Sequence, residues 1–368
     1  MKITVNRNVI LPPLQMLIGV VERRQTLPIL SNVLIKLEKS QAIVTATDLE
    51  VEMAVTVGVS DGDGEEGRCT LPARKFVDIC RALGDEVVLD MNVEGEKCVI
   101  KAGRSRFKLA TLPADEFPNV GAVEGSLLFS AEETALASLF SATQFAMAQQ
   151  DVRYYLNGML LDLYPGEVRA VATDGHRLAV AKRELQVEIP DNQQFIVPRK
   201  AVMELTRLLV RENSKVAVYR SDKHLRLQTS DWVFTTKLVD GRFPEYQRVI
   251  PEGADKLVLI DREALRQALV RVSILTNEKY KSVRIVAERG VMRIQANNPE
   301  QEEAVEDVPA SYDSEAVEIG FNVSYLLDVL STVKTDNVEI RLSDPSSCCL
   351  IAGEGDDTCQ YVIMPMRL

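Results

Sequence analysis

Two short segments of the chain combine side chains that could perform chemistry. The segment 174–177 brings a carboxylate close to the imidazole of His176, and the run 300–303 is acidic. Paired carboxylates can bind Mg²⁺ for phosphoryl transfer. The acidic residues, however, follow one another in a single strand-to-loop run, and the sequence offers no second acidic cluster, nucleophile elbow or phosphate loop to accompany them. The sequence therefore argues against an enzyme, and we assign no catalytic residue.

Metal, disulfide and nucleotide chemistry are equally weakly supported. His176 and His224 are the only histidines, so a multi-histidine metal site is impossible within one chain. The six cysteines form no Cys-x-x-Cys pair, and adjacent Cys348 and Cys349 would be awkward in a disulfide framework, so we expect reduced packing residues. The segment DGDGEEG (61–67) lacks the ending of a phosphate loop and indicates a solvated acidic loop. We predict neither a metal nor a cofactor.

The elements that must position these side chains repeat along the 368-residue chain at a spacing of about 125 residues. Each repeat opens with a short strand followed by an amphipathic helix. Ser130 is expected to cap the second of these helices, with Glu133 completing a capping box, and Asp261 is expected to cap the third. The three openings are residues 3–21, 127–145 and 257–275.

Strands and a second helix follow each opening. Sequence similarity of T-A-T-D at 45–48 to V-A-T-D at 171–174 aligns the first two copies. The first predicted strands are 30–38, 156–164 and 282–288, and the second are 42–55, 168–181 and 291–305. The six predicted helices are 7–20, 72–83, 131–144, 199–211, 261–272 and 324–334. The chain is therefore predicted to be an α+β protein of three similar domains, 1–124, 125–253 and 254–368, each with two helices and antiparallel sheets.

Charge is distributed unevenly between the predicted helices and the rest of the chain. The net charge is −11, yet the six predicted helices together carry +5 and the remainder −16. Scattered solvated cations would explain this, and so would a shared cationic surface that attracts a polyanion. No apolar run approaches the ~18 residues of a membrane helix, and Asn8, Pro12 and Pro13 interrupt the amino-terminal region where a secretory core would lie. We expect a cytoplasmic protein without a membrane partner.

Many specific segments, in order along essentially the whole chain, carry a family resemblance. Among them are TLPADEFP (111–118), QDVRYYLNGML (150–160), ATDGHRLAV (172–180), ANNPEQEEA (296–304) and VIMPMRL (362–368). With these the chain resembles the bacterial DNA polymerase III beta subunits, the sliding clamps. The resemblance implies the DNA-clamp fold and a homodimer that closes head to tail into a ring around duplex DNA, without sequence preference. It implies a non-catalytic subunit that tethers the polymerase. The alternative is a protein-interaction scaffold that does not encircle DNA.

The resemblance also implies three groups of site residues. Direct DNA contacts fall on Arg24, Arg74, Gln150, Tyr154 and Tyr155. A pocket for short partner peptides is formed by Leu156, Thr173, Gly175, His176, Arg177, Leu178, Pro244, Arg248, Val249, Asn322, Tyr325, Val362, Met364, Pro365, Met366 and Arg367. The dimer interface joins Lys75, Arg104, Arg106, Phe107 and Leu109 to Ile274, Leu275, Glu300, Glu302 and Glu303. The implied peptide partners are the polymerase III alpha subunit, clamp-loader subunits, other DNA polymerases and repair proteins.

Simpler interpretations of the same residues stay open at this point. Tyr154 or Tyr155 could pack at a domain edge instead of meeting DNA. The segment 174–177 alone is typical of a tight turn with a satisfied histidine. The basic residues near Arg106 and the acidic run 300–303 could be separate solvated surfaces.

Overall fold

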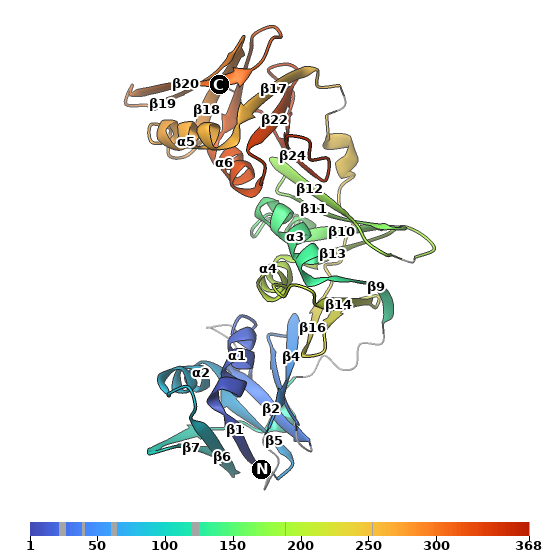
Figure 1. Ribbon diagram of the computed structural model, residues 1–368, viewed down its shortest axis with the longest axis vertical. Helices are drawn as coiled ribbons and strands as arrows, with labels where there is room; N and C mark the ends of the chain where they lie inside the picture. The colour runs from blue at the N-terminus through green and yellow to red at the C-terminus, as the bar shows by residue number, and fades with distance from the viewer. Residues whose placement is uncertain are drawn as a thin grey trace. The chain divides into compact units, whose positions relative to one another are not determined.

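The computed structural model describes residues 1–21, 27–38, 41–59, 65–118, 125–187, 189–251 and 253–367. These residues divide into two compact units (Figure 1). The first unit comprises Met1–Glu133 and Arg207–Leu238, and the second comprises Thr134–Thr206 and Val239–Leu368.

The first unit contains two antiparallel sheets. The smaller has the order β1 (Lys2–Asn6), β6 (Val88–Glu94), β7 (Lys97–Ala102) and β8 (Ser105–Ala110). The larger has the order β5 (Gly67–Pro72), β2 (Asn32–Glu38), β3 (Gln41–Thr47), β4 (Val51–Gly58), β16 (Trp232–Lys237), β15 (His224–Gln228), β14 (Lys215–Arg220) and β9 (Ser126–Glu132). Helices α1 (Arg7–Leu17) and α2 (Ala73–Ala82) pack against each other and against strands β2–β5.

The second unit is built on one antiparallel sheet of twelve strands (Figure 1). Its order is β13 (Gln193–Pro198), β10 (Gly158–Tyr164), β11 (Glu167–Thr173), β12 (Arg177–Glu184), β24 (Cys359–Ile363), β23 (Cys349–Gly353), β22 (Asn337–Leu342), β17 (Lys256–Asp261), β20 (Glu303–Ser311), β19 (Val291–Asn297), β18 (Ser282–Glu288) and β21 (Val317–Asn322). The other helices are α3 (Glu133–Thr143), α4 (Arg199–Leu208), α5 (Arg262–Ser273) and α6 (Val323–Thr332). Helices α5 and α6 pack together.

The strand orders contain the repeat that the sequence predicts. Each copy has two runs of four strands, for example β1-β6-β7-β8 and β5-β2-β3-β4 in the first. The corresponding runs are β9-β14-β15-β16 and β13-β10-β11-β12 in the second copy, and β17-β22-β23-β24 and β21-β18-β19-β20 in the third. The predicted α+β class, with three similar copies of two helices and antiparallel sheets, is confirmed.

Pairing of β12 with β24 is the feature of this sheet that matters most for the site. It sets Arg177 opposite Ile363 and Leu178 opposite Val362, in antiparallel register. Strands separated by more than 170 residues of sequence thereby lie side by side. This pairing brings the segment 174–177 close to the end of the chain.

The predicted capping box at Ser130 is wrong. Ser130 continues strand β9 and pairs with Ala217 of β14. Helix α3 instead begins at Glu133, whose buried carboxylate accepts hydrogen bonds from the Ser214 hydroxyl (2.9 Å) and the Arg211 amide (3.3 Å). Asp261 does cap α5, accepting from the Ala264 amide at 2.7 Å.

Each predicted second strand is in fact two strands joined by a turn. The turns centre on Asp48, Asp174 and Asn298, whose side-chain oxygens accept backbone N–H groups two to four residues ahead. These local bonds take the place of hydrogen bonds to a neighbouring strand, and the strand ends there. The hydrophobic alternation resumes after each turn, so the sequence pattern alone hid the break.

Candidate functional site

The segment 174–177 forms a tight turn between β11 and β12. The Asp174 carboxylate accepts from the amides of His176 (2.9 Å) and Arg177 (3.1 Å). The Thr173 hydroxyl accepts from the Gly175 amide (3.1 Å) and donates to the Arg177 carbonyl (2.6 Å). Gly175 has φ = +88°, a conformation that favours glycine. The turn therefore fixes the backbone positions from which the side chains of His176 and Arg177 project.

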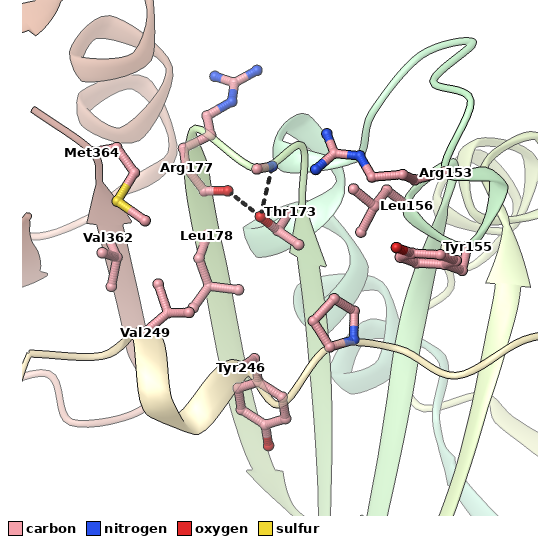
Figure 2. Close-up of a pocket in the computed structure, with 12 residues that line it drawn as sticks. Arg153, Tyr155, Leu156, Thr173, Arg177, Leu178, Tyr246, Val249, Val362 and Met364 are labelled. Atoms are coloured by element: carbon pink, nitrogen blue, oxygen red, sulfur yellow. Dashed lines mark hydrogen bonds between the residues drawn. The ribbon is translucent and has the colours of Figure 1, made fainter. Parts of the chain in front are cut away.

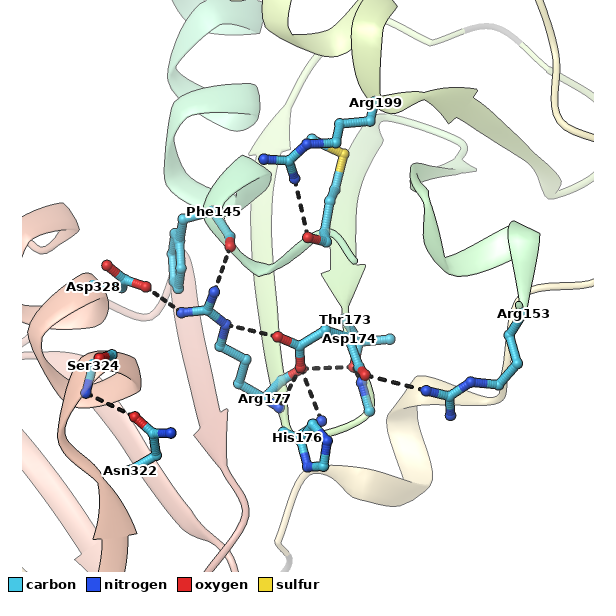
Figure 3. Close-up of polar contacts among 12 residues, drawn as sticks. Phe145, Arg153, Thr173, Asp174, His176, Arg177, Arg199, Asn322, Ser324 and Asp328 are labelled. Carbon is cyan, nitrogen blue, oxygen red and sulfur yellow. Dashed lines mark hydrogen bonds and ion pairs between the residues drawn. The ribbon is translucent and has the colours of Figure 1, made fainter. Parts of the chain in front are cut away.

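The Arg177 guanidinium connects this turn to two distant elements (Figure 3). It donates to Asp174 (3.1 Å), to the Phe145 carbonyl (2.8 Å) in η3 (Gln144–Ala146), and to Asp328 of α6. It also lies 4.6 Å from the ring centroid of Tyr325 on α6. Only 12% of the Arg177 side chain is exposed, so these partners replace most of its water.

A cavity of about 140 Å³ opens beside this turn (Figure 2). Its lining is largely apolar, with guanidinium groups at one side, a combination that suits an apolar chain carrying a few polar groups. The lining residues are Arg153, Tyr155, Leu156, Thr173, Gly175, Arg177, Leu178, Pro244, Tyr246, Val249, Val362 and Met364. They come from β11, β12 and β24, from η4 (Tyr154–Leu156) and η5 (Tyr246–Val249), and from the segments beside them.

A buried cluster supports the cavity from behind. Leu156, Leu178, Tyr246 and Val362 belong both to the lining and to this cluster, so the cavity wall is continuous with the core. Cys348, which is partly buried, packs against the same cluster and donates weakly to the Val249 carbonyl at 3.6 Å. Packing at core density makes such a wall rigid.

Most of the residues predicted for the peptide pocket meet at this one cavity. They are Leu156, Thr173, Gly175, Arg177, Leu178, Pro244, Val249, Val362 and Met364. His176 lies beside the cavity and stacks on Tyr325 with ring centroids 6.2 Å apart. The remaining predicted residues are found elsewhere: Arg248 is exposed and pairs with Glu245 (2.7 Å), and Asn322 caps α6.

The last three predicted pocket residues line a second, more open cavity. Pro365, Met366 and Arg367 face Glu318, Gly320, Pro345 and Ser346 around a volume of about 570 Å³. The Met366 amide donates to the Gly320 carbonyl at 2.8 Å, which holds the end of the chain against β21. The chain thus passes directly from Met364 in the first cavity to this second one.

Arg153 and Tyr246 line the first cavity but were missed by the sequence analysis. Asp151 holds Arg153 through hydrogen bonds of 2.9 and 3.0 Å, and these bonds lower the pKa of the Asp151 carboxyl to about 2. Arg153 also donates to the Asp174 carbonyl at 3.3 Å (Figure 3). The sequence signal was present, because Arg153 lies next to residues predicted to meet DNA, but it did not separate a pocket from a DNA surface.

The residues predicted to contact DNA are found in three settings. Arg24 lies outside the described residues. Arg74 is exposed on α2 and donates to the Val21 carbonyl at 3.0 Å. Gln150 is exposed, with φ = +56°, and Tyr154 is 57% exposed, whereas neighbouring Tyr155 faces the first cavity.

The residues predicted for the dimer interface fall into two groups. Arg104, Arg106, Phe107 and Leu109 all belong to the β7–β8 hairpin, and of these Leu109 is buried. Lys75 is exposed on α2 in the same unit. The second group lies at the end of α5 and the start of β20. There Ile274 is 75% exposed, Leu275 is half-buried, and the glutamates Glu300, Glu302 and Glu303 are exposed.

The remaining side chains that could perform chemistry in the described part of the chain are possible metal ligands and thiols. Within it, no group of three or more His, Cys, Asp and Glu side chains could hold a metal ion. All six cysteines are free thiols. Burial raises the pKa of Cys69, Cys80 and Cys349 to about 12, so at neutral pH these groups stay protonated. None of the helices formed by the described residues is long and apolar enough to span a membrane.

The sequence and the fold both match proteins of one kind. Residues 1–121, 131–245 and 247–367 match the N-terminal, central and C-terminal domains of the DNA polymerase III beta subunit. The beta sliding clamp of Pseudomonas aeruginosa is 52% identical over 368 residues, with 100% of both chains covered. A crystal structure of a sliding clamp from the same organism has a TM-score of 0.97 and 51% identity, and one of Caulobacter crescentus pol III beta has 0.93 and 37%; each comparison covers 100% of both chains.

Proposed function

This chain belongs to the DNA polymerase III beta subunits, the beta sliding clamps, and from that premise we propose how it closes a ring, where it meets DNA and what it holds. As a member of this family it is a non-catalytic processivity subunit that acts in DNA replication. We assign its three clamp domains to residues 1–124, 125–253 and 254–368. The repeated strand runs support these boundaries, because each copy's eight strands fall within one of the three ranges.

One observation about the sheets carries the proposal of a closed ring. Strand β4 of the first copy pairs with β16 of the second, and β12 of the second pairs with β24 of the third. In both junctions the last strand of one run in a copy pairs with the last strand of the other run in the next copy. Strand β20 occupies in the third copy the place of β4 and β12. The strand that occupies the place of β16 and β24 in the first copy is β8, so β20 is expected to pair with a β8. Among the described strands, β8 pairs only with β7, and β20 pairs on its outer side with β17 only at Ala310 and Ser311. Strand β20 of one chain therefore pairs with β8 of a second chain.

Charge and apolar surface on the two edges are complementary. The hairpin of β8 carries Arg104, Arg106 and Lys108, while β20 and the residues before it carry Glu300, Glu302 and Glu303. Phe107 on one side and Ile274 on the other supply an apolar centre. A head-to-tail pair forms two such junctions and leaves no edge of this kind free, which closes the assembly and prevents filament growth.

Two chains, not one, give an opening of the right size. Helices pack about 10 Å apart, so the six helices of one chain, arranged around a hole, give a circumference of about 60 Å. After the helix thickness is subtracted, the opening is only about 10 Å wide. Twelve helices leave about 28 Å, enough for a duplex of roughly 20 Å. The ring holds DNA by enclosure, so its contacts are weak and blind to sequence. We assign these contacts to Arg24, Arg74, Gln150, Tyr154 and Tyr155.

The first cavity is the binding site for short partner peptides. Its lining of Leu156, Leu178, Val249, Val362 and Met364 provides a socket for apolar anchors, in which the flexible Met364 side chain can adapt to the anchor. The guanidinium groups beside it orient the polar backbone of the peptide. The partners are the polymerase III alpha subunit, clamp-loader subunits, other DNA polymerases and repair proteins. The chain works in the cytoplasm, because the DNA that it encircles lies there.

The solution mass and particle shape test this function. We expect light scattering to give about 82 kDa, twice the 40.9 kDa of one chain, and electron microscopy to show a closed ring with a central hole. A compact particle of one chain without a hole would refute encirclement. It would favour the alternative, a protein-interaction scaffold that never surrounds DNA.

A further inference from the structure

Behind the first cavity lies a buried carboxylate that the proposed function does not use. Asp162, on β10, is fully buried. Its carboxylate accepts from the hydroxyls of Tyr246 (2.8 Å) and Tyr164 (3.0 Å) and from the Gln194 side-chain amide (3.1 Å). A buried carboxylate is strongly unfavourable unless donors of this kind satisfy it. Three donors meeting on one buried group form a network in which each fixes the others.

Only one of these donors reaches the cavity. Tyr246 is 3% exposed and lines the cavity together with Leu178 and Val249. Figure 2 shows its hydroxyl pointing away from the other labelled lining residues, which is the direction required to meet Asp162. Tyr164 and Gln194 bind the same carboxylate but are absent from the lining.

The network keeps the Tyr246 hydroxyl a donor. Burial raises the pKa of Tyr246; the hydrogen bond with Arg169 opposes this rise and the neighbouring Asp162 charge adds to it, and the net rise keeps the phenol protonated. Arg169, which hydrogen-bonds Tyr246, lies 4.6 Å from the Tyr164 ring centroid and pairs with Glu167 at 2.6 Å. The ring of Tyr246 is therefore restrained both by core packing and by a charge-assisted bond at its far end.

We propose that Asp162 is a positioning residue for the peptide pocket: its buried carboxylate holds the Tyr246 ring as a fixed wall of the first cavity. This inference rests on the proposed peptide-binding role of that cavity. If the wall is already ordered in the free protein, it loses little conformational entropy when the peptide binds. The affinity for the peptide is therefore higher. Asp162 therefore acts on the peptide through Tyr246, without touching it.

The test is a double-mutant cycle read out as peptide affinity. The probe is a fluorescein-labelled octapeptide with two leucine anchors, compared with the same peptide carrying serine at both positions. Asp162→Asn and Tyr246→Phe are each expected to weaken binding of the leucine peptide about tenfold. Asp162→Asn removes the charge from this contact and Tyr246→Phe removes the hydroxyl, so both changes act on the same bond. The double variant should therefore bind the peptide no more weakly than whichever single variant has the lower affinity. Additive losses would overturn the proposal.

Tyr164→Phe is the matched control. It removes the same kind of hydrogen bond from the same carboxylate, at a ring that does not line the cavity. We expect Tyr164→Phe and Tyr246→Phe to lower the melting temperature similarly, but only Tyr246→Phe to weaken the peptide by more than twofold. Equal weakening by both would show a general structural effect and overturn the proposal. If Asp162→Asn fails to fold, the comparison of Tyr164→Phe with Tyr246→Phe still tests the proposal.

The two proposals fail in different ways. If the wild-type chain binds the leucine and serine peptides equally, the cavity is not a socket for apolar anchors, and the proposed peptide site falls together with this inference. If the wild-type chain prefers the leucine peptide and Tyr246→Phe leaves its affinity unchanged, only the positioning role of Asp162 is overturned.

Discussion

Single residues in the site are held by partners that are distant in sequence. Arg177 joins its own turn to Phe145 and to Asp328, which is 151 residues away. The turn itself could be predicted from the sequence, because Asp and Gly at those positions favour it. The partners of Arg177 and the bond between Asp162 and Tyr246 could not, because only the strand pairing brings those residues together.

Replacing Arg177 tests its structural contribution. Arg177→Ala removes the bonds to Asp174, Asp328 and the Phe145 carbonyl and should destabilise the fold by about 2 kcal/mol. We expect the melting temperature, followed by circular dichroism, to fall by roughly 5 °C. Arg242→Ala is the control, since that side chain is 86% exposed and its pair with Glu245 is solvated. Equal melting of wild type and Arg177→Ala would contradict this role.

The Asp151–Arg153 pair at the edge of the cavity makes a pH prediction. Hydrogen bonds from Arg153 lower the pKa of Asp151 from 3.8 to about 2. A depressed carboxyl pKa stabilises the fold above the unfolded value and loses that effect as the pH falls through the folded value. We expect the Asp151 carboxyl carbon to titrate near pH 2 by NMR, and at a higher pH in Arg153→Gln, which loses the guanidinium bonds but keeps the backbone N–H bond. A wild-type midpoint near 3.8 would show that the pair does not form in solution.

At the scale of elements, hydrophobic periodicity predicted all six helices to within a few residues. It failed where a local polar group changed the backbone. Asp48, Asp174 and Asn298 each end a strand at a point where the apolar alternation continues in the sequence. Ser130 looked like a helix cap, yet the ladder to Ala217 kept it in a strand. The conformation of Ser130 depends on pairing with β14, which lies far away in the sequence. The residues around Ser130 therefore could not reveal it.

The exposed end of α5 predicts what holds the two chains together. Ile274 is 75% exposed in the single chain, and the proposed junction with the β8 hairpin of a second chain would cover it. The double variant Ile274→Ala/Leu275→Ala should therefore shift the mass by light scattering from about 82 kDa to the 40.9 kDa of one chain. Val210→Ala, at another exposed apolar residue, should leave the dimer intact. An unchanged mass for the double variant would refute this interface.

For the whole molecule, the internal repeat argues for enclosure. Two of its junctions are formed within the chain, by β4 with β16 and by β12 with β24, and the third is left for a second copy. The sequence predicted three copies, but not which strands join them. The side-chain pattern of a strand indicates which of its faces is buried, but not which strand pairs with it. The acidic net charge of −11 would oppose simple DNA binding, so a topological hold explains how such a chain stays on DNA.

Retention on DNA of two topologies tests enclosure most directly. Clamps loaded by a clamp loader onto nicked circular DNA should stay bound through gel filtration at moderate salt, and should be lost when one restriction cut linearises the circle. Contacts with phosphates alone weaken steeply with salt whatever the topology. Equal retention on circular and linear DNA, with the same salt dependence, would contradict the account.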